Sequence, residues 1–319
     1  MTSPSSFPAA RASFSAAELV SDLDLSGGDL SLLVEAAAQI RTNPGAYRQA
    51  LEGRTLALLF EKPSLRTRVT FEVAIKSLGG EAIYYDCRYE PLGQRESVAD
   101  VARNLERWVD AIAARTFRQT TIEELARWAK IPVINALSDR YHPCQALADV
   151  LTLKDVFGKL EGIRLAFVGD GNNVAHSLLL TGAGAGLHVR VATPPSYEPD
   201  PEIVRAATAI ASQTGGSVHV GNDPAEAVSG AHAVYTDVWT SMGSEQEAEE
   251  RRQRFAPYRV TEQLFAQARP DAVFLHCLPA HRGEEVEAAV IDSSRSVVFD
   301  QAENRLHAQK ALLWLLLAR

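Results

Sequence analysis

The sequence contains few cysteines: three in 319 residues, and no two of them have the C-x-x-C spacing. An odd number of widely separated cysteines predicts neither a disulfide framework nor a structural zinc site. Because free thiols persist in a reducing compartment, this composition favours a cytoplasmic protein. The sequence also predicts no set of metal-binding residues.

Long apolar runs are missing as well. The longest run near the C-terminus covers residues 311–318, whereas a membrane-spanning helix needs roughly 20 apolar residues. The formal net charge is −8 and no arginine-rich arm stands out, which argues against a general nucleic-acid binder. We therefore expect no membrane and no nucleic-acid partner, and any bound anion must be held by a local group of basic residues.

The first residues lack the apolar core of a secretory signal. Residues 1–16 are rich in Ser, Ala and Pro, and Arg11 is their only charged residue. We predict that residues 1–20 form a disordered tail.

In the rest of the chain, short apolar segments alternate with longer amphipathic ones, which is typical of parallel α/β layers. The expected strands are 55–60, 82–85, 111–114, 132–135, 164–168, 188–192, 217–221, 233–236, 272–276 and 296–299. The expected helices lie near 30–40, 66–78, 97–108, 122–129 and, connecting the two halves, 146–157. The predicted fold is α/β, with two open parallel-sheet domains and the active site in the crevice between them.

The first expected strand is followed by a junction with the features of a phosphate site. A proline breaks the strand, and the sequence SLRTR (residues 64–68) then opens a helix. The first amides of a helix have no intrahelical partners, and the helix dipole favours an anion there. Ser64 and Thr67 can donate hydroxyl hydrogen bonds, while Arg66 and Arg68 carry planar charged groups that match phosphate. An ordinary helix cap with two surface arginines is the alternative.

Two further strand ends of the first half carry polar residues. Arg115 follows the third expected strand, where it supplies either a charge for a ligand or a surface ion pair. After the fourth strand, Pro143 fixes a turn that leaves His142 and Gln145 near a helix start. The imidazole can polarise a carbonyl and the amide can recognise an NH2 group, although a turn histidine without function is the alternative.

In the second half, the sequence GDGNN (residues 169–173) follows a strand and opens a helix. It lacks the third glycine and the later acidic residue of a dinucleotide fingerprint, so its asparagines suit a carboxylate better than a nicotinamide cofactor. Asp237, at a later strand end, can hold an ammonium group, and the small residues 241–243 after it suit a mobile loop. Cys277 follows another strand, where packing is the usual role of a lone cysteine.

Seven motifs, taken together, resemble the ornithine carbamoyltransferases: SLRTR, RTF, HPCQ, GDGNN, DVWTSMG, HCLPAHRG and ENR. The resemblance covers the chain from about residue 21 to the C-terminus. It implies transfer of the carbamoyl group of carbamoyl phosphate to the δ-amine of L-ornithine, giving L-citrulline and phosphate, in arginine biosynthesis or the arginine deiminase pathway. It also implies an enzyme without a cofactor, assembled as a homotrimer or a multiple of trimers.

The resemblance also implies domains and site residues. Residues 21–148 would bind carbamoyl phosphate, 149–302 would bind ornithine, and 303–319 would form a C-terminal helix that packs on the first domain. The residues implied to be catalytic are Arg66, Arg115, His142 and Cys277. Carbamoyl phosphate would be bound by Ser64, Leu65, Arg66, Thr67, Arg115, His142, Gln145, Cys277, Leu278 and Arg305. Ornithine would be bound by Asn173, Asp237, Ser241 and Met242.

Two positions depart from the family pattern. Position 65 is Leu where the family most often has Thr, which matters little if the backbone amide does the binding. Pro91 occupies the position of a Gln that, in the family, often reaches carbamoyl phosphate in a neighbouring subunit. Gln94 or Arg95 would then have to substitute for it.

The resemblance leaves four rival functions. The first is an aspartate carbamoyltransferase, in which HPTQ and HPLPR stand where this chain has HPCQ and HCLP. The second is a relative that uses putrescine or N-acylated ornithine, and such relatives usually lack the S-M-G loop. A nucleotide-binding dehydrogenase and a homologue without activity are the others. The complete set of reacting groups argues against the last of these.

Overall fold

The structure is a computed structural model that describes residues 13–240 and 248–318. The chain forms two compact units: unit 1 contains the residues up to Leu151 and from Asn304 onward, and unit 2 contains Thr152–Glu303. The boundaries expected from the sequence fall after residues 148 and 302. Each unit is built on one parallel sheet, as the α/β prediction requires.

The sheet of unit 1 has the strand order β2-β1-β3-β4, and all neighbouring strands are parallel. Its strands are β1 (Thr55–Phe60), β2 (Glu81–Asp86), β3 (Ala111–Arg115) and β4 (Val133–Leu137). The chain adds β2 on one side of β1 and then returns to add β3 on the other side. The switch point of this sheet therefore lies between β1 and β3, and ligands of such sheets bind at the carboxyl ends of the strands there.

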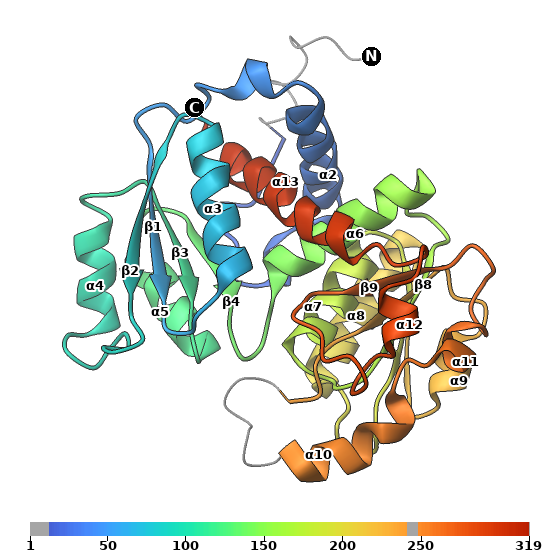
Figure 1. Ribbon diagram of the computed structural model, residues 1–319. Helices are drawn as coiled ribbons and strands as arrows, with labels where there is room; N and C mark the ends of the chain where they lie inside the picture. The colour runs from blue at the N-terminus through green and yellow to red at the C-terminus, as the bar shows by residue number, and fades with distance from the viewer. Residues whose placement is uncertain (1–12, 241–247, 319) are drawn as a thin grey trace. The chain divides into compact units, whose positions relative to one another are not determined.

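The helices of unit 1 cover its sheet. They are α2 (Gly27–Thr42), α3 (Leu65–Ser77), α4 (Val98–Leu105), α5 (Gln119–Trp128) and the unit 1 parts of α6 (Pro143–Phe157) and α13 (Val298–Leu317). Helices α4 and α5 lie together beside the strands (Figure 1). There Ile122 and Leu125 pack in one fully buried cluster with Ile112 of β3.

The sheet of unit 2 has the order β7-β6-β5-β8-β9 and is also parallel throughout. Its strands are β5 (Arg164–Val168), β6 (His188–Ala192), β7 (Ser217–Gly221), β8 (Ala233–Thr236) and β9 (Val273–His276). The helices that follow the connecting α6 are α7 (Asn173–Gly184), α8 (Pro201–Thr214), α9 (Pro224–Val228), α10 (Ala248–Phe255), α11 (Glu262–Phe265) and α12 (Ala288–Ile291). The switch point lies between β5 and β8.

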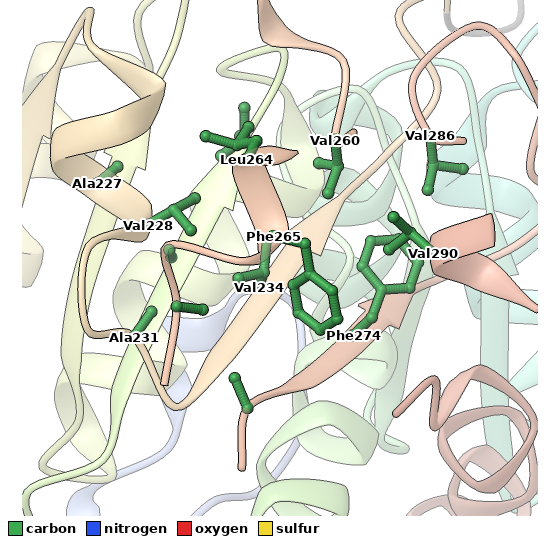
Figure 2. Close-up of a cluster of buried hydrophobic side chains, with 14 of the residues drawn as sticks. Ala227, Val228, Ala231, Val234, Val260, Leu264, Phe265, Phe274, Val286 and Val290 are labelled. Atoms are coloured by element: carbon green, nitrogen blue, oxygen red, sulfur yellow. The ribbon is translucent and has the colours of Figure 1, made fainter. Parts of the chain in front are cut away.

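One core cluster of unit 2 fills a face of its sheet beside β8 and β9. Val234 and Phe274 extend from these strands toward Phe265 and Val290, which come from α11 and α12 (Figure 2). The rings of Phe265 and Phe274 meet edge to face with centroids 6.2 Å apart. This cluster anchors the segment around Val286, which also lies in it.

The prediction of a strand at residues 296–299 is wrong. Only Ser296 forms an isolated bridge, to Phe274, and helix α13 begins at Val298 rather than near residue 303. Val298 and Gln301 are buried while Phe299 is 74% exposed, so burial follows the three- and four-residue spacing of a helix. The apolar triplet at residues 297–299, which runs into the first turn of this helix, is too short to distinguish the two structures.

Residues 13–20, which the sequence analysis assigned to a disordered tail, pack on unit 1. Leu19 is fully buried and pairs with the edge strand β4: its amide donates to Val133 O at 2.9 Å and its carbonyl accepts from Asn135 N at 2.7 Å. Ser15 also donates to Asp29 through its amide and its hydroxyl, both at 2.7 Å. These contacts tie the segment to unit 1, and composition does not reveal them.

Helix α13 contains the apolar run noted in the sequence. Ala311, Leu312 and Leu313 are fully buried in unit 1, so the run faces a protein core. Of the helices in the described ranges, none is both long and apolar enough to cross a membrane.

Candidate functional site

The candidate residues gather at the switch point of each sheet. In unit 1, Ser64 follows β1 and Arg115 ends β3, the two strands that flank the switch point. In unit 2, GDGNN follows β5 and Asp237 follows β8, which again flank it. The strand ends predicted from sequence are thus brought together within each unit, because carboxyl ends of parallel strands meet at one edge.

In unit 1, the N-terminus of α3 forms the expected anion site. Ser64 caps the helix, since its hydroxyl oxygen accepts from Thr67 N at 3.3 Å. Thr67 is buried, Arg66 is half-buried, and the Leu65 side chain is 76% exposed. Because the side chain at position 65 points to solvent, only its backbone is available for a ligand at the helix start, and the departure from Thr changes little.

Arg305 of α13 reaches this helix start. Its Nη2 donates to Thr67 Oγ1 at 3.1 Å, and its Nη1 donates to Gln145 Oε1 at 2.6 Å. Gln145 in turn donates through Nε2 to Asp149 Oδ1 at 2.8 Å. The Gln145 amide therefore holds Arg305 in place, a role that the sequence analysis did not assign to it.

His142 lies among the arginines of unit 1. Burial lowers the pKa of its imidazole well below the ordinary value of 6.5, and the charges of Arg305, Arg115 and Arg66 lower that pKa further. A ring surrounded in this way stays neutral at pH 7 and carries one N–H. It can donate a hydrogen bond to an oxygen without adding a fourth positive charge to the group.

The pKa of His142 predicts how stability changes with pH. Below its ordinary pKa of 6.5, the unfolded chain binds a proton that the folded protein does not bind. The free energy of unfolding should therefore fall with decreasing pH, by up to about 1.4 kcal/mol per pH unit from this group. His142→Gln should remove that part of the slope, as measured by urea unfolding at pH 7.5 and 5.5. The exposed His219→Gln serves as the control and should keep the wild-type slope; equal slopes for all three proteins would contradict the prediction.

In unit 2, Asp237 is the centre of a small polar cluster. Its Oδ1 accepts from Cys277 Sγ at 3.0 Å, and its Oδ2 accepts from Asn172 Nδ2 at 2.9 Å. Asp237 is buried and Cys277 is partly exposed. The carboxylate is thus held by two donors with its orientation fixed, as a group that recognises an ammonium ion must be.

Of the two asparagines in GDGNN, only Asn173 was predicted to bind ornithine, and Asn172 has a supporting role. This residue caps α7, because its Oδ1 accepts from Val174 N and Ala175 N at 2.9 and 3.2 Å, while its amide nitrogen holds Asp237. Its place directly before a helix was the available signal. Asn173, which the analysis chose, is the half-buried first residue of α7.

The glycines of GDGNN are explained by packing. A Cβ on Gly171 would lie 2.3 Å from Pro199 N, and Gly169 has a φ of 148°. The close packing and the backbone conformation of this loop already require glycine at both positions. The two glycines therefore give no independent support to a dinucleotide site.

Two groups of side chains in the described residues have donor atoms within 4.8 Å of one another, as metal ligands do: Asp237, His276 and Cys277, and His281, Glu284 and Glu285. In the first group the donor atoms are already engaged with protein. The carboxylate oxygens of Asp237 accept the two bonds described above, and His276 contacts Leu278 N through Nδ1 and Glu285 through Nε2. A metal ion would have to displace these contacts.

Two expected ornithine ligands, Ser241 and Met242, lie outside the described residues. Leu278 follows Cys277 directly and is half-buried. Of the other expected residues, those for carbamoyl phosphate fall in unit 1 except for Cys277 and Leu278, and Asn173 and Asp237 fall in unit 2.

Comparisons with known proteins match two successive parts of the chain to two profiles of one family. Residues 18–155 match the family profile "Aspartate/ornithine carbamoyltransferase, carbamoyl-P binding domain", and residues 161–316 match "Aspartate/ornithine carbamoyltransferase, Asp/Orn binding domain". The ornithine carbamoyltransferase of Thermus thermophilus is 55% identical over 299 residues, which cover 92% of this chain and 96% of that protein. The anabolic ornithine carbamoyltransferase of Pyrococcus furiosus is 54% identical over 273 residues, 86% of this chain and 87% of that protein.

A solved structure is similar to the whole described fold. The structure of ornithine carbamoyltransferase from Pyrococcus furiosus matches with a TM-score of 0.92 and 50% identity, covering 95% of this chain and 97% of that one. Both family profiles, the relatives and the fold lead to the same conclusion: the chain belongs to the aspartate/ornithine carbamoyltransferase family.

Proposed function

We propose that this protein is an ornithine carbamoyltransferase, which transfers the carbamoyl group of carbamoyl phosphate to the δ-amine of L-ornithine and releases L-citrulline and phosphate. The observation that carries the proposal is that each unit holds a different set of polar groups. Unit 1 holds a group of arginines around a neutral histidine, and unit 2 holds a buried carboxylate beside a thiol. The first suits the phosphate group of an acyl phosphate and the second suits an amino acid.

In the proposed mechanism, unit 1 stabilises both charges that form during transfer. Attack on the carbamoyl carbon produces an oxyanion, and phosphate leaves with several negative charges. The neutral His142 donates a hydrogen bond to the carbamoyl oxygen, while Arg66 and Arg115 contact the phosphate. Arg305, held by Thr67 and Gln145, adds a fixed positive charge beside the helix start.

The amine must lose a proton before it attacks. A lysine-like amine has a pKa near 10, so freeing it at pH 7 costs about 4 kcal/mol. In the proposal, Asp237 orients the amino acid. The amine proton passes to the substrate phosphate, or to the Cys277 sulfur once the thiol has given its own proton to Asp237. Cys277→Ala should then change both turnover and its pH dependence.

The proposed function is tested by offering four amines to the purified protein. Each of ornithine, putrescine, N-acetylornithine and aspartate is supplied with carbamoyl phosphate, and ureido product is measured. We expect product with ornithine at least about 100-fold faster than with the others, since a site built for polar groups rejects analogues that lack them. No product with ornithine would refute the proposal.

We also propose that the protein acts in the cytoplasm in arginine biosynthesis. The anabolic relative from Pyrococcus furiosus supports the direction of the reaction. All three cysteines are free, which suits a reducing compartment.

A homotrimer is the proposed assembly, and an exposed apolar face of unit 1 supports self-association. Ile83 and Tyr85 on the edge strand β2 are 57% and 50% exposed, and Trp108 after α4 is 70% exposed. Together they line a pocket of about 360 Å³ that also includes Pro91 and Arg95 of the loop before α4. Open apolar surface on an edge strand is normally covered by another chain.

Trp108→Glu should therefore disrupt the assembly. A charge placed on this face would be buried in the interface, so we expect the mass measured by light scattering to fall toward that of one chain. Phe299→Glu is the matched control, because Phe299 is equally exposed at 74% but lies in α13. An unchanged mass for Trp108→Glu, or equal losses in the two variants, would exclude this face as the interface.

A further inference from the structure

The turn after β9 carries two candidate site residues, Cys277 and Leu278, in an unfavourable backbone conformation. Leu278 has a φ of 57°, in the left-handed region. For a residue with a Cβ this conformation costs about 1–2 kcal/mol. Such a residue persists only where its surroundings hold it, so the contacts of this turn decide where the thiol and the following backbone lie.

His276, the last residue of β9, holds the turn through its ring. The backbone amide of Leu278 donates to His276 Nδ1 at 2.9 Å. Because an amide N–H can only donate, Nδ1 must be the acceptor, and the ring hydrogen is therefore on Nε2. The ring is buried, and the backbone N–H of the same residue donates to Gln301 Oε1 at 2.9 Å.

Glu285 contacts the other side of this ring. Its Oε1 lies 3.3 Å from His276 Nε2 and also accepts from His281 N at 2.5 Å, and its side chain is fully buried. The carboxylate is therefore placed to receive the Nε2 hydrogen, which selects the tautomer that leaves Nδ1 free to accept.

The position of Glu285 is fixed independently of the turn. Its carbonyl accepts from Val260 N at 2.9 Å, and Glu287 N donates to Val260 O at 3.1 Å. The next residue, Val286, is fully buried in the core cluster shown in Figure 2. The backbone of Glu285 is thus held in place, so its side chain can orient the imidazole.

We propose that Glu285 and His276 are positioning residues for the reaction: the buried carboxylate fixes the imidazole, and the imidazole fixes the Cys277–Leu278 turn against Asp237. Through this turn, the Cys277 thiol keeps its 3.0 Å contact with Asp237 Oδ1, and the Leu278 backbone keeps its place beside it. Neither residue touches substrate in this scheme. The expected effect of changing these residues on turnover rests on the proposed function. Their expected effect on the position of the Cys277 thiol does not.

Two substitutions at position 276 separate positioning from simple stabilisation. In His276→Asn, the side-chain oxygen can accept from the amide two residues on, as Nδ1 does now. In His276→Gln, the longer side chain reaches toward Glu285 instead and leaves that amide without its acceptor. Both variants disturb the buried ring, so their unfolding midpoints should fall by similar amounts.

Their activities should differ. We expect kcat/KM for ornithine to stay within about threefold of wild type in His276→Asn and to fall about 10- to 100-fold in His276→Gln, corresponding to one lost buried hydrogen bond. The Kd of inorganic phosphate, which we assign to residues of unit 1, should change in neither. Glu285→Gln, which keeps an acceptor oxygen, should resemble His276→Asn, and Glu285→Met should resemble His276→Gln.

Alkylation of Cys277 by iodoacetamide gives a second readout that needs no turnover. Burial raises the pKa of Cys87 and of Cys144 to about 12, so both react slowly. Cys277→Ala provides the blank. We expect alkylation to be several-fold faster in His276→Gln and Glu285→Met than in wild type, His276→Asn or Glu285→Gln, because the thiol leaves its partner when the turn relaxes.

Three results would overturn the proposal. The first is that His276→Asn and His276→Gln lose activity equally, in proportion to the fall in their unfolding midpoints. Glu285 and His276 would then only stabilise the fold. The second is wild-type kinetics in His276→Gln, and the third is an alkylation rate that does not follow the predicted order. If wild type forms no ureido product, the proposed function fails, and the alkylation order still decides the positioning role.

Discussion

Arg66→Met should lower kcat/KM for carbamoyl phosphate by about 100- to 1000-fold, the usual effect of removing one charge-stabilising group from an active site. Arg66 lies in the first turn of α3, where the helix dipole favours an anion. Its guanidinium can hold two phosphate oxygens at once, and methionine preserves much of its volume without its charge. The KM for carbamoyl phosphate should rise along with the loss in kcat.

The chain offers a matched control two residues away. Arg68 is exposed: its Nε donates to Glu72 Oε1 at 2.8 Å, and its guanidinium lies 3.6 Å from the centroid of the Tyr84 ring. Exposed helix pairs of this kind contribute about 0.5 kcal/mol or less, so Arg68→Met should change activity by less than about threefold. Equal losses in the two variants would show that the helix start is not the phosphate site.

A spectroscopic measurement tests Arg66 without turnover. Its charge is one cause of the low pKa of His142, after burial and after Arg305 and Arg115. Removing that charge should raise the pKa of His142, which NMR titration of the ring can detect. If the pKa of His142 did not rise in Arg66→Met, Arg66 would not lie close to the imidazole.

Most strands were predictable from sequence because each is a short apolar run with clear ends. The runs at 55–60, 164–168, 188–192, 217–221 and 233–236 form strands with those bounds. The error at 296–299 has the same origin, because a few apolar residues at the start of a helix look like a short strand. Strand order was not predictable, since the pairing that places β1 between β2 and β3 depends on long-range contacts.

The candidate site was predictable where a residue acts through its own chemistry. Arg66, His142 and Asp237 follow strands and carry groups whose roles are readable from residue type. Residues that act through another residue were missed: Asn172 orients Asp237, and Glu285 orients His276. Their partners lie 65 and 9 residues away in the sequence, and no local pattern marks a hydrogen bond between such positions.

Asp237→Asn should be the most damaging change in unit 2. We expect kcat/KM for ornithine to fall about 100- to 1000-fold, because the variant leaves the substrate ammonium group without its charged partner. Asparagine retains an oxygen that can accept from Cys277 Sγ, as Asp237 Oδ1 does at 3.0 Å, while its NH2 group faces the Asn172 amide nitrogen and loses that hydrogen bond. The variant therefore separates recognition of the amino group from the support of the thiol.

The binding of phosphate should not change in Asp237→Asn. The helix start, Arg115, His142 and Arg305 all belong to unit 1, so the Kd of inorganic phosphate measured by calorimetry should stay within about twofold of wild type, as for sites that share no contacts. Asp271→Asn is the control for the substitution itself. Asp271 is exposed, pairs with Arg269 and lies at the opposite, amino end of β9.

Asp271→Asn should therefore have nearly wild-type kinetics with ornithine. If Asp237→Asn also kept its kcat/KM, the carboxylate would serve only to hold Cys277, and ornithine would be recognised elsewhere. If instead both the ornithine and the phosphate affinities fell, the variant would have lost its fold rather than a contact. A ligand site at the carboxyl ends of β5 and β8 requires two results. Asp237→Asn must weaken the use of ornithine but not the binding of phosphate, and Asp271→Asn, at the amino end of the sheet, must weaken neither.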